Sequence, residues 1–351
     1  MKKTIALLLV LVLAFGQLVG CGSSTVETAV GTTPATEETS SAPETAAQMP
    51  NAGTTIRLGG LKGPTSMGLV KLLSDGEEGQ TENSYEFTMA ASADELTPLL
   101  LRGELDVLAV PANLGAILYN NSDGAVQMAA INTLGVLYIA EKGGEEIQSL
   151  ADLKGRTLYA TGKGTTPEYT LRYLLSQAGL SLDEDLTVEW RSEPTEVVAQ
   201  LAASTHAAAM LPQPFVTVAQ TQLEDLRIAL DLNAEWESLD NGSALVTACL
   251  LVRKAFAEEH PEQLAAFLEE YAASAQYVNK NPEEAAVLVE RYDIVKAAVA
   301  QKAIPYCNIV CVTGSQMRTM AEGYLAVLYQ QNPASVGGAM PGEDFYLNNE
   351  A

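Results

Sequence analysis

Two short polar segments of this sequence carry residue types that bind anions or other polar ligands. Lys62–Ser66 reads KGPTS and Lys163–Pro167 reads KGTTP, and each follows an apolar, strand-like run. In both, glycine, proline and hydroxyl residues lead into a helical pattern, so backbone N–H groups and hydroxyls would gather at a helix N-terminus. The helix dipole is positive there. The segments could therefore form a phosphate site, half of an active site, or a pair of ligand-binding loops.

The residue spacing does not support a nucleotide-phosphate site. A P-loop reads G-x-x-x-x-G-K-[ST], in which the lysine reaches the phosphates and the hydroxyl binds magnesium. Gly63 and Gly68 have this spacing, but Leu69 and Val70 follow them and can do neither job. In the second segment, Pro167 stands where a dinucleotide-binding G-x-G-x-x-G has its last glycine.

The polar side chains of both segments have a structural alternative. Thr65, Ser66, Thr165 and Thr166 belong to the residue types that cap their own helices. Glu168, in the first turn after the second segment, would be stabilised by the helix dipole, or would contact an amine or hydroxyl of a ligand. Both interpretations stay open for each residue.

Catalytic and metal-binding groups are scarce in this sequence. His206 and His260 stand at a helix–strand junction and before a proline, where surface or capping roles are commoner than catalysis. No G-x-S-x-G or H-E-x-x-H motif is present. Cys249, Cys307 and Cys311 have no histidine nearby, so we expect buried thiols and no metal, with a Cys307–Cys311 disulfide as the alternative. We predict no catalytic residue, no cofactor and no enzyme activity.

The composition is that of a folded, acidic protein. Of the 351 residues, 47% are hydrophobic and 18% are charged, and the net charge is −24. Nucleic-acid binding needs clustered positive charge, which this composition argues against. Acidity indicates a soluble, self-repelling surface. We expect a monomer without a nucleic-acid partner.

The N-terminal region has the pattern of an export signal. Two lysines precede the apolar run Thr4–Phe15, which is too short for a confident transmembrane helix. The run leads into Leu18–Gly22 (LVGCG), which resembles the lipobox of bacterial lipoproteins, with Cys21 at the lipid-modified position. We predict a signal peptide over 1–20 and a lipidated, flexible tether over 21–53, which would anchor the protein outside the cytoplasmic membrane. A plain signal peptide is the alternative.

From residue 54 onward, strand-like apolar runs alternate with helical patterns. The expected strands are 55–61, 85–91, 106–110, 156–161, 186–190, 207–211, 226–230 and 244–252. The expected helices include 66–73, 94–101, 111–119, 167–177, 195–203 and 316–330, with further helix starts at the His-Pro and Asn-Pro pairs 260–261 and 281–282. Ser92 and Glu95 have the spacing of a capping box. The alternation indicates an α/β fold with parallel sheets.

These elements divide into two predicted lobes. We expect residues 54–137 and 243–351 to form the first lobe and residues 138–242 to form an inserted second lobe, with two crossings that make a hinge. Ligands of open α/β sheets bind beyond the carboxyl ends of the strands, so the two polar segments would face each other across a cleft. A sequential two-domain layout is the alternative.

Longer segments and their order resemble bacterial solute-binding proteins. Three resemble elements of the two lobes of that family, namely SLADLKGRTLYA (Ser149–Ala160), GELDVLAVPANLGA (Gly103–Ala116) and HAAAMLPQPFVTVA (His206–Ala219). SVGGAMPGEDFYL (Ser335–Leu347) resembles a tail seen among such lipoproteins. The most similar subfamily feeds ABC importers for nitrate, sulfonate or taurine, and thiamine pyrimidine precursors. The resemblance implies a bilobal α/β periplasmic-binding-protein type II fold: two parallel-core sheets with flanking helices, joined by a two-crossing hinge.

The resemblance also implies a function and a binding site. The protein would be an extracytoplasmic solute-binding protein that captures a small molecule by hinge closure and delivers it to an ABC permease. Together with Glu168, the expected ligand contacts are Gly63, Pro64, Thr65, Ser66, Pro111, Ala112, Asn113, Thr133, Gly164, Thr165, Thr166, Thr195, Gln213 and Pro214. No arginine falls within these loops, so the charge of the ligand stays open. The alternatives are an enzyme of pyrimidine or menaquinone precursor synthesis on the same fold, and a binding or sensory lipoprotein without a transporter.

Overall fold

The computed structural model describes residues 54–348, all of which belong to one compact unit, Met49–Ala351. The expected signal peptide, the lipid attachment at Cys21 and the tether lie outside the described residues. No helix of the described part has the length and apolar character needed to cross a bilayer.

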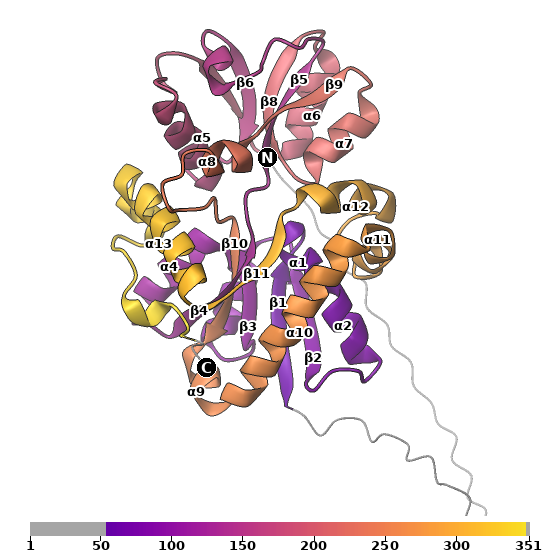
Figure 1. The fold of residues 1–351 in the computed structure, drawn as a ribbon, viewed down its shortest axis with the longest axis vertical. Coiled ribbons are helices and arrows are strands. Elements are labelled where there is room, and N and C mark those ends of the chain that lie inside the picture. The colour runs from indigo at the N-terminus through magenta and orange to yellow at the C-terminus, as the bar shows by residue number, and fades with distance from the viewer. Residues whose placement is uncertain (1–53, 349–351) are drawn as a thin grey trace, which may run out of the picture. The chain divides into compact units, whose positions relative to one another are not determined.

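The first of two sheets has six strands in the order β11-β4-β10-β3-β1-β2 (Figure 1). Its strands are β1 (Thr55–Leu61), β2 (Ser84–Ala90), β3 (Val107–Pro111), β4 (Val126–Thr133), β10 (Ala248–Arg253) and β11 (Ile309–Val312). β1 is parallel to β2 and β3, as expected. β10 runs antiparallel to β3 and β4, and β11 runs antiparallel to β4, so the sheet is mixed around a parallel core.

The second sheet has five strands in the order β7-β6-β8-β5-β9. Its strands are β5 (Leu137–Lys142), β6 (Thr157–Thr161), β7 (Thr187–Arg191), β8 (Ala207–Pro212) and β9 (Leu226–Asp231). β6 is parallel to β7 and β8. β5 is antiparallel to both of its neighbours, β8 and β9, so this sheet is also mixed. We call the elements built on the first and second sheets the first and second lobes.

The antiparallel strands β5 and β10 each follow a crossing between the lobes. β4 ends at Thr133 and β5 begins at Leu137, while the second lobe ends near Glu237 and β10 begins at Ala248. The carboxyl ends of the parallel strands face the other lobe, so a chain that crosses enters the next sheet from that side. It must then run away from the crossing, opposite to the parallel strands. This geometry explains the two mixed sheets.

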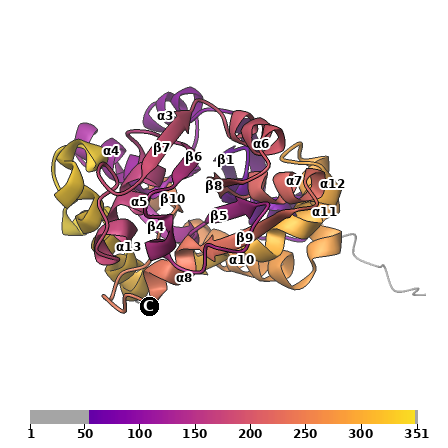
Figure 2. The same cartoon turned by 90° about the horizontal axis from the view of Figure 1, so that it is seen from above.

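Helices cover both faces of each sheet. The first lobe contains α1 (Pro64–Met67), α2 (Val70–Glu77), α3 (Ala93–Leu101), α4 (Ala112–Asn121), α9 (Lys254–Glu259), α10 (Pro261–Lys280), α11 (Pro282–Arg291), α12 (Ala297–Ala303) and α13 (Gly314–Gln331). The second lobe contains α5 (Thr166–Gln177), α6 (Pro194–Ala203), α7 (Phe215–Gln222) and α8 (Leu232–Glu237). Short 3₁₀ helices are η1 (Leu150–Leu153), η2 (Ile304–Tyr306), η3 (Pro333–Val336) and η4 (Glu343–Phe345). Seen from above, α6 and α7 lie on one side of the second sheet and α5 on the other (Figure 2).

The two faces of the second sheet follow from strand periodicity. Successive side chains of a strand point to opposite faces. On β8, Ala208 and Met210 pack in the hydrophobic cluster that includes α5, whereas Ala209 and Leu211 pack in the cluster that includes α6 and α7. Both faces are therefore apolar, as expected for a strand buried between two layers of helices.

Local signals set several helix boundaries. The capping box is confirmed: the N–H of Asp94 donates to Ser92 Oγ at 3.3 Å, and the N–H of Ser92 donates to Glu95 Oε1 at 3.2 Å. The single helix expected over 66–73 is wrong, because α1 ends before Gly68 and α2 begins at Val70. A Cβ at Gly68 would lie 2.6 Å from the Tyr271 hydroxyl. The break thus lies where the backbone approaches α10.

One hydrophobic cluster joins the two lobes. It contains Leu174 of α5 and Trp236 of α8 together with Tyr324 and Leu328 of α13. The Trp236 and Tyr324 ring centroids are 5.7 Å apart. Helix α13 belongs to the first lobe by sequence and also packs against α5. The lobes therefore share a buried apolar contact in addition to the two crossings.

Candidate functional site

A cavity of about 380 Å³ lies where the two lobes meet. Its lining comes from the end of β3 and start of α4, the start of α5, the end of β8, and both crossings. The lining residues are Pro111, Asn113, Leu114, Val136, Leu137, Thr165, Thr166, Pro167, Thr170, Pro212, Leu245 and Thr247. We call it the interlobe cavity. Four of the expected ligand contacts line it, namely Pro111, Asn113, Thr165 and Thr166.

Asn113 and Thr166 meet directly across the lobes. The Thr166 hydroxyl of α5 donates a hydrogen bond to Asn113 Oδ1 of α4 at 3.1 Å. Asn113 Nδ2 donates to the backbone carbonyl of Ser335, also at 3.1 Å. The second bond fixes which side of the Asn113 amide faces the second lobe. One side chain therefore connects the second lobe to the C-terminal segment of the first.

The start of α5 is held by its own side chains. The Thr165 hydroxyl donates to the carbonyl of Gly162 at 2.7 Å and does not cap the helix. Glu168 Oε2 accepts from the N–H of Gly164 at 2.6 Å, and Glu168 Oε1 pairs with Arg172 at 3.0 Å. Glu168 is absent from the cavity lining. Its contacts agree with the stabilising interpretation, and a ligand contact through Glu168 stays a prediction.

The C-terminal end of α13 also forms hydrogen bonds with the start of α5. Gln331 Nε2 donates to the backbone carbonyl of Tyr169 at 3.0 Å, and Asn332 Nδ2 donates to the Tyr169 hydroxyl at 2.8 Å. The same hydroxyl donates to the carbonyl of Gly164 at 3.0 Å. We call these contacts the Tyr169 clasp. The clasp holds the loop of the second polar segment against the first lobe.

The first polar segment lies outside the interlobe cavity. Thr65 and Ser66 both donate their hydroxyl hydrogen bonds to the carbonyl of Leu61, at 3.2 and 2.7 Å. Neither caps α1, so the capping interpretation is wrong for both. Asn132 Nδ2 donates to the Thr65 carbonyl at 2.8 Å. Gly63–Ser66 is thus held against the ends of β1 and β4, and its contact with a ligand stays a prediction.

Two expected contacts are buried polar residues next to the cavity. Thr133 is fully buried and its hydroxyl has no hydrogen-bond partner among the described residues. Gln213 is 2% exposed; its Oε1 accepts from Thr217 at 2.8 Å, but its Nε2 has no partner among them. The N–H of Gln213 donates to the carbonyl of Val136, a lining residue, at 2.9 Å. Such buried, unpaired groups are rare in proteins and mark places where water or ligand supplies the missing bond.

The remaining expected contacts do not line the cavity either. Ala112 is fully buried in the first turn of α4. Thr195 is exposed at the start of α6, and Pro214 precedes α7. Gly164 lies in the loop that Glu168 holds. These residues stay predictions without a supporting position in the interlobe cavity.

Several lining residues were missed by the sequence interpretation. Val136, Leu137, Leu245 and Thr247 lie on or beside the crossings, which the sequence did place between the lobes. Thr170 lies one helical turn after Thr166, so the helical period could have identified it. The expected contacts were taken from polar loops and the helix starts that follow them. The leucine and valine residues that form the apolar wall of the cavity were therefore left out.

A tyrosine of α13 lies behind this wall. Burial raises the pKa of Tyr324, whose hydroxyl lies beside Thr166 and Thr170, so the phenol stays neutral. Neither the Tyr324 hydroxyl nor Thr170 Oγ1 makes a hydrogen bond of good geometry. Thr170 Oγ1 is itself fully buried beside Tyr324, so a molecule in the cavity would reach it only after a rearrangement of the wall.

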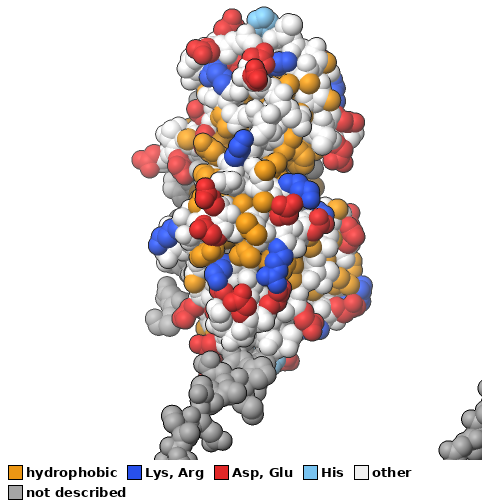
Figure 3. Space-filling model, turned by 90° about the vertical axis from the view of Figure 1, so that its right-hand side faces the viewer, with side chains coloured by type: hydrophobic (Ala, Val, Ile, Leu, Met, Phe, Trp, Pro, Cys, Tyr) orange, Lys and Arg blue, Asp and Glu red, His pale blue; other side chains and the backbone are white. Residues whose placement is uncertain are grey.

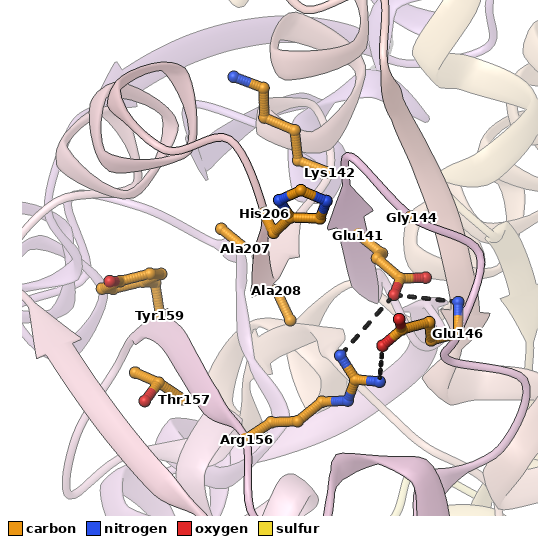
Figure 4. Close-up of a pocket in the computed structure, with 10 residues that line it drawn as sticks. All are labelled: Glu141, Lys142, Gly144, Glu146, Arg156, Thr157, Tyr159, His206, Ala207 and Ala208. Atoms are coloured by element: carbon orange, nitrogen blue, oxygen red, sulfur yellow. Dashed lines mark hydrogen bonds and ion pairs between the residues drawn. The ribbon is translucent and has the colours of Figure 1, made fainter.

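A second pocket, at the opposite end of the second lobe, is charged but internally neutralised (Figure 4). Arg156 pairs with Glu146 at 2.6 Å and lies 3.9 Å from Glu141. Lys142 Nζ donates to the carbonyls of Leu201, Ala202 and Ser204 near the end of α6, at 3.0, 3.3 and 2.8 Å. Arg156 and Lys142 are thus both engaged by groups of the second lobe itself.

The lobes also approach each other between α7 and α12. Thr217, Gln220 and Thr221 of the second lobe line a groove there with Lys302 and Tyr306 of the first. Figure 3 shows one face of the molecule, with hydrophobic side chains visible at the level between the lobes. The Tyr138 hydroxyl of β5 donates to the Tyr306 carbonyl at 2.7 Å. Contacts between the lobes thus occur on both sides of the crossings.

The three cysteines within residues 54–348 are free thiols. Cys249 and Cys307 are buried, which confirms that part of the prediction, whereas Cys311 is only partly buried. The Cys307–Cys311 disulfide is therefore not formed. Burial raises the pKa of Cys307 to about 12 and that of Cys311 to about 11, so both stay protonated at neutral pH. Within residues 54–348, no three His, Cys, Asp or Glu side chains gather as a metal site would require.

Solved structures resemble this fold over most of its length. A crystal structure of an ABC transporter protein from Parabacteroides distasonis is 23% identical, with a TM-score of 0.72 over 84% of this chain and 99% of that one. The periplasmic aliphatic sulphonate binding protein SsuA of Escherichia coli is 16% identical, with a TM-score of 0.65 over 85% and 94%. The periplasmic nitrate-binding protein NrtA of Synechocystis is 16% identical, with a TM-score of 0.50 over 74% and 69%. The fold is therefore that of the type II periplasmic binding proteins, as expected.

The family follows from the sequence match. Among curated proteins, none matches this sequence. Residues 77–302 match the family described as "ABC transporter, phosphonate, periplasmic substrate-binding protein". Because this match covers more than half of the chain, the protein belongs to that family of ABC-transporter periplasmic substrate-binding proteins.

Proposed function

We propose that the protein holds a small molecule in the interlobe cavity and delivers it to an ABC permease. The observation that carries the proposal is the cavity itself, which is lined by α4, α5 and both crossings. A molecule bound there would contact both lobes at once. It would therefore stabilise the arrangement in which the lobes are close, because a ligand favours the state to which it binds more tightly.

Closure would occur by rotation at the two crossings. Val136 and Leu137 lie at the first crossing and Leu245 and Thr247 at the second, and all four line the cavity. A rotation there would change the cavity and separate Asn113 from Thr166. Hinge closure around a ligand is a known mode of switching in two-lobed binding proteins. The lobe boundaries at residues 137 and 242 belong to this proposal.

The cellular setting is part of the same proposal. The protein would be exported, lipidated at Cys21 and held by its tether outside the cytoplasmic membrane as a monomer. It would transport rather than transform its ligand, so we propose no enzyme activity. The sequence led us to expect a relationship to sulfonate- and nitrate-type importers. The shared fold of SsuA and NrtA supports this relationship but does not identify the ligand of this protein.

A thermal-shift screen tests ligand capture. The mature chain would be screened against sulfonates, phosphonates, pyrimidines, flavins, amino acids and neutral amides. A ligand at 100 times its dissociation constant should add about 2.7 kcal/mol of stability. The control is a Thr166→Val, Asn113→Ala double variant. A hit that binds this variant as tightly as the wild type would place binding elsewhere, and turnover of a hit would favour an enzyme.

A further inference from the structure

The lining of the interlobe cavity contains no charged side chain. Its walls consist of leucine, valine and proline residues together with threonine hydroxyls and the amide of Asn113. The anion ligands named for the family and for its structural neighbours would need a compensating positive charge or several donors there. Burying an ionised group without such partners is strongly unfavourable.

The two helix starts at the cavity supply only part of that compensation. At α5, the carboxylate of Glu168 already accepts from the N–H of Gly164, and Pro167 has no N–H to offer. The Glu168 side chain is only 13% exposed, so its negative charge lies close to the helix start. At α4, Pro111 also lacks an N–H, and the N–H of Ala112 donates to the Thr247 carbonyl at 3.1 Å. The positive ends of both helices are thus partly occupied by the protein itself.

The groups that remain suit a neutral polar end and an apolar body. Leu114, Val136, Leu137 and Leu245 provide apolar surface. Thr247 is a partly exposed lining residue, and its hydroxyl can both donate and accept a hydrogen bond. A volume of about 380 Å³ falls in the range of small-molecule sites. These features match a compact ligand whose single polar group both donates and accepts.

We propose that the ligand is an uncharged, mainly aliphatic small molecule with one amide-like or hydroxyl-like end, rather than a phosphonate, sulfonate or nitrate. The inference rests on the proposed function, because it assumes that the ligand occupies the interlobe cavity. The polar end would contact Thr247 and the Asn113–Thr166 pair. The aliphatic part would cover the leucine and valine side chains at the crossings.

Three matched probes separate charge from shape. Hexanamide, hexanoate and hexane-1-sulfonate share a straight aliphatic chain and differ mainly in the charge and geometry of the polar end. Calorimetric titration of the mature chain at pH 7 should give a dissociation constant for the amide at least tenfold below that of either anion. Equal or tighter binding of an anion would overturn the proposal. So would failure of the amide to bind at millimolar concentration.

Two variants locate the binding and test its cause. Thr247→Val removes one hydroxyl at nearly constant volume and should weaken amide binding about fivefold. Thr319→Val is the matched control, because Thr319 is an exposed helical threonine of α13 that donates to the carbonyl of Ser315 at 3.0 Å. Leu114→Lys places a positive charge at the cavity and should shift preference toward hexanoate and hexane-1-sulfonate.

The outcomes distinguish the class of ligand from the site. If an anion binds best to the wild type and Thr247→Val weakens that binding, the site is right and the proposed ligand class is wrong. If a probe binds and neither Thr247→Val nor Leu114→Lys changes its affinity, the interlobe cavity is not the site and the proposed function is wrong as well. Unchanged preference in Leu114→Lys alone would contradict the electrostatic argument.

Discussion

Replacing Thr166 by valine removes the one hydroxyl that links α5 to Asn113 across the lobes. Valine has nearly the same shape, so packing at the start of α5 should persist. The lost bond joins neutral groups at 3.1 Å in a half-buried position. Such a bond contributes about 1 kcal/mol, which corresponds to about a fivefold change in an equilibrium constant. Because the bond exists only when the lobes are close, Thr166→Val should shift the closed–open equilibrium by about that factor.

Hydrogen–deuterium exchange measures this shift without attaching a probe to the protein. Amides in 111–118 and 166–175 border the cavity and should exchange about fivefold faster in the variant, while amides of the central strands should not change. Any ligand of the closed state should also bind about fivefold more weakly. Thr319→Val is the control, because the exposed Thr319 hydroxyl donates to the Ser315 carbonyl within α13 at 3.0 Å. Unchanged exchange and unchanged affinity in Thr166→Val would refute a closed state held by this bond.

Three further predictions concern the first-lobe core, the shared core and the anchor. Burial would raise the pKa of Asp106, but hydrogen bonds from Arg57 and Arg253 hold it below its ordinary value. The carboxylate thus contributes stability above about pH 4, and this stability is lost as the pH falls through its folded pKa. Asp106→Asn should therefore lower the free energy of unfolding by about 2 kcal/mol at pH 7 and by less at pH 3. Urea titration at the two pH values measures both losses. Equal losses at both pH values would contradict this linkage. Trp236→Ala should cost about 3–5 kcal/mol in the same assay, because the side chain is fully buried between the lobes; a loss below about 1 kcal/mol would mean that the shared core is not stabilising. Cys21→Ser should abolish lipid labelling in cells, and a wild type released unlipidated into the medium would refute the anchor.

Local sequence rules predicted the elements better than their pairing. The Ser92–Glu95 capping box and the starts of α10 and α11 depend on neighbouring residues, so their signals are visible in the sequence. The break at Gly68 depends on Tyr271, which lies on another helix far along the chain. Likewise, β10 was expected as a strand over 244–252, whereas β5 was not among the expected strands. Their antiparallel direction follows from the path of the chain between the lobes, which no local pattern records.

The candidate site shows the same division. The two similar polar segments predicted that Thr65 and Thr165 contact the ligand in equivalent ways from the two lobes. The structure pairs Thr166 with Asn113 instead, and Thr65 bonds within its own loop. Glycine and threonine signals locate loops but not the lobe that each loop will face. The apolar wall escaped prediction because leucine and valine near the crossings look the same as core residues.

The Tyr169 clasp limits how the lobes can move. Two crossings define a line, and rotation about a line is a soft, continuous motion. The clasp is one of several further attachments between the lobes, in which Gln331 and Asn332 hold Tyr169 by hydrogen bonds. A rotation that moves α5 away from α13 must first break this attachment. If the lobes open as proposed, these bonds must break together with the Asn113–Thr166 bond, so the last turn of α13 would contribute to the lifetime of the closed form as well as the crossings.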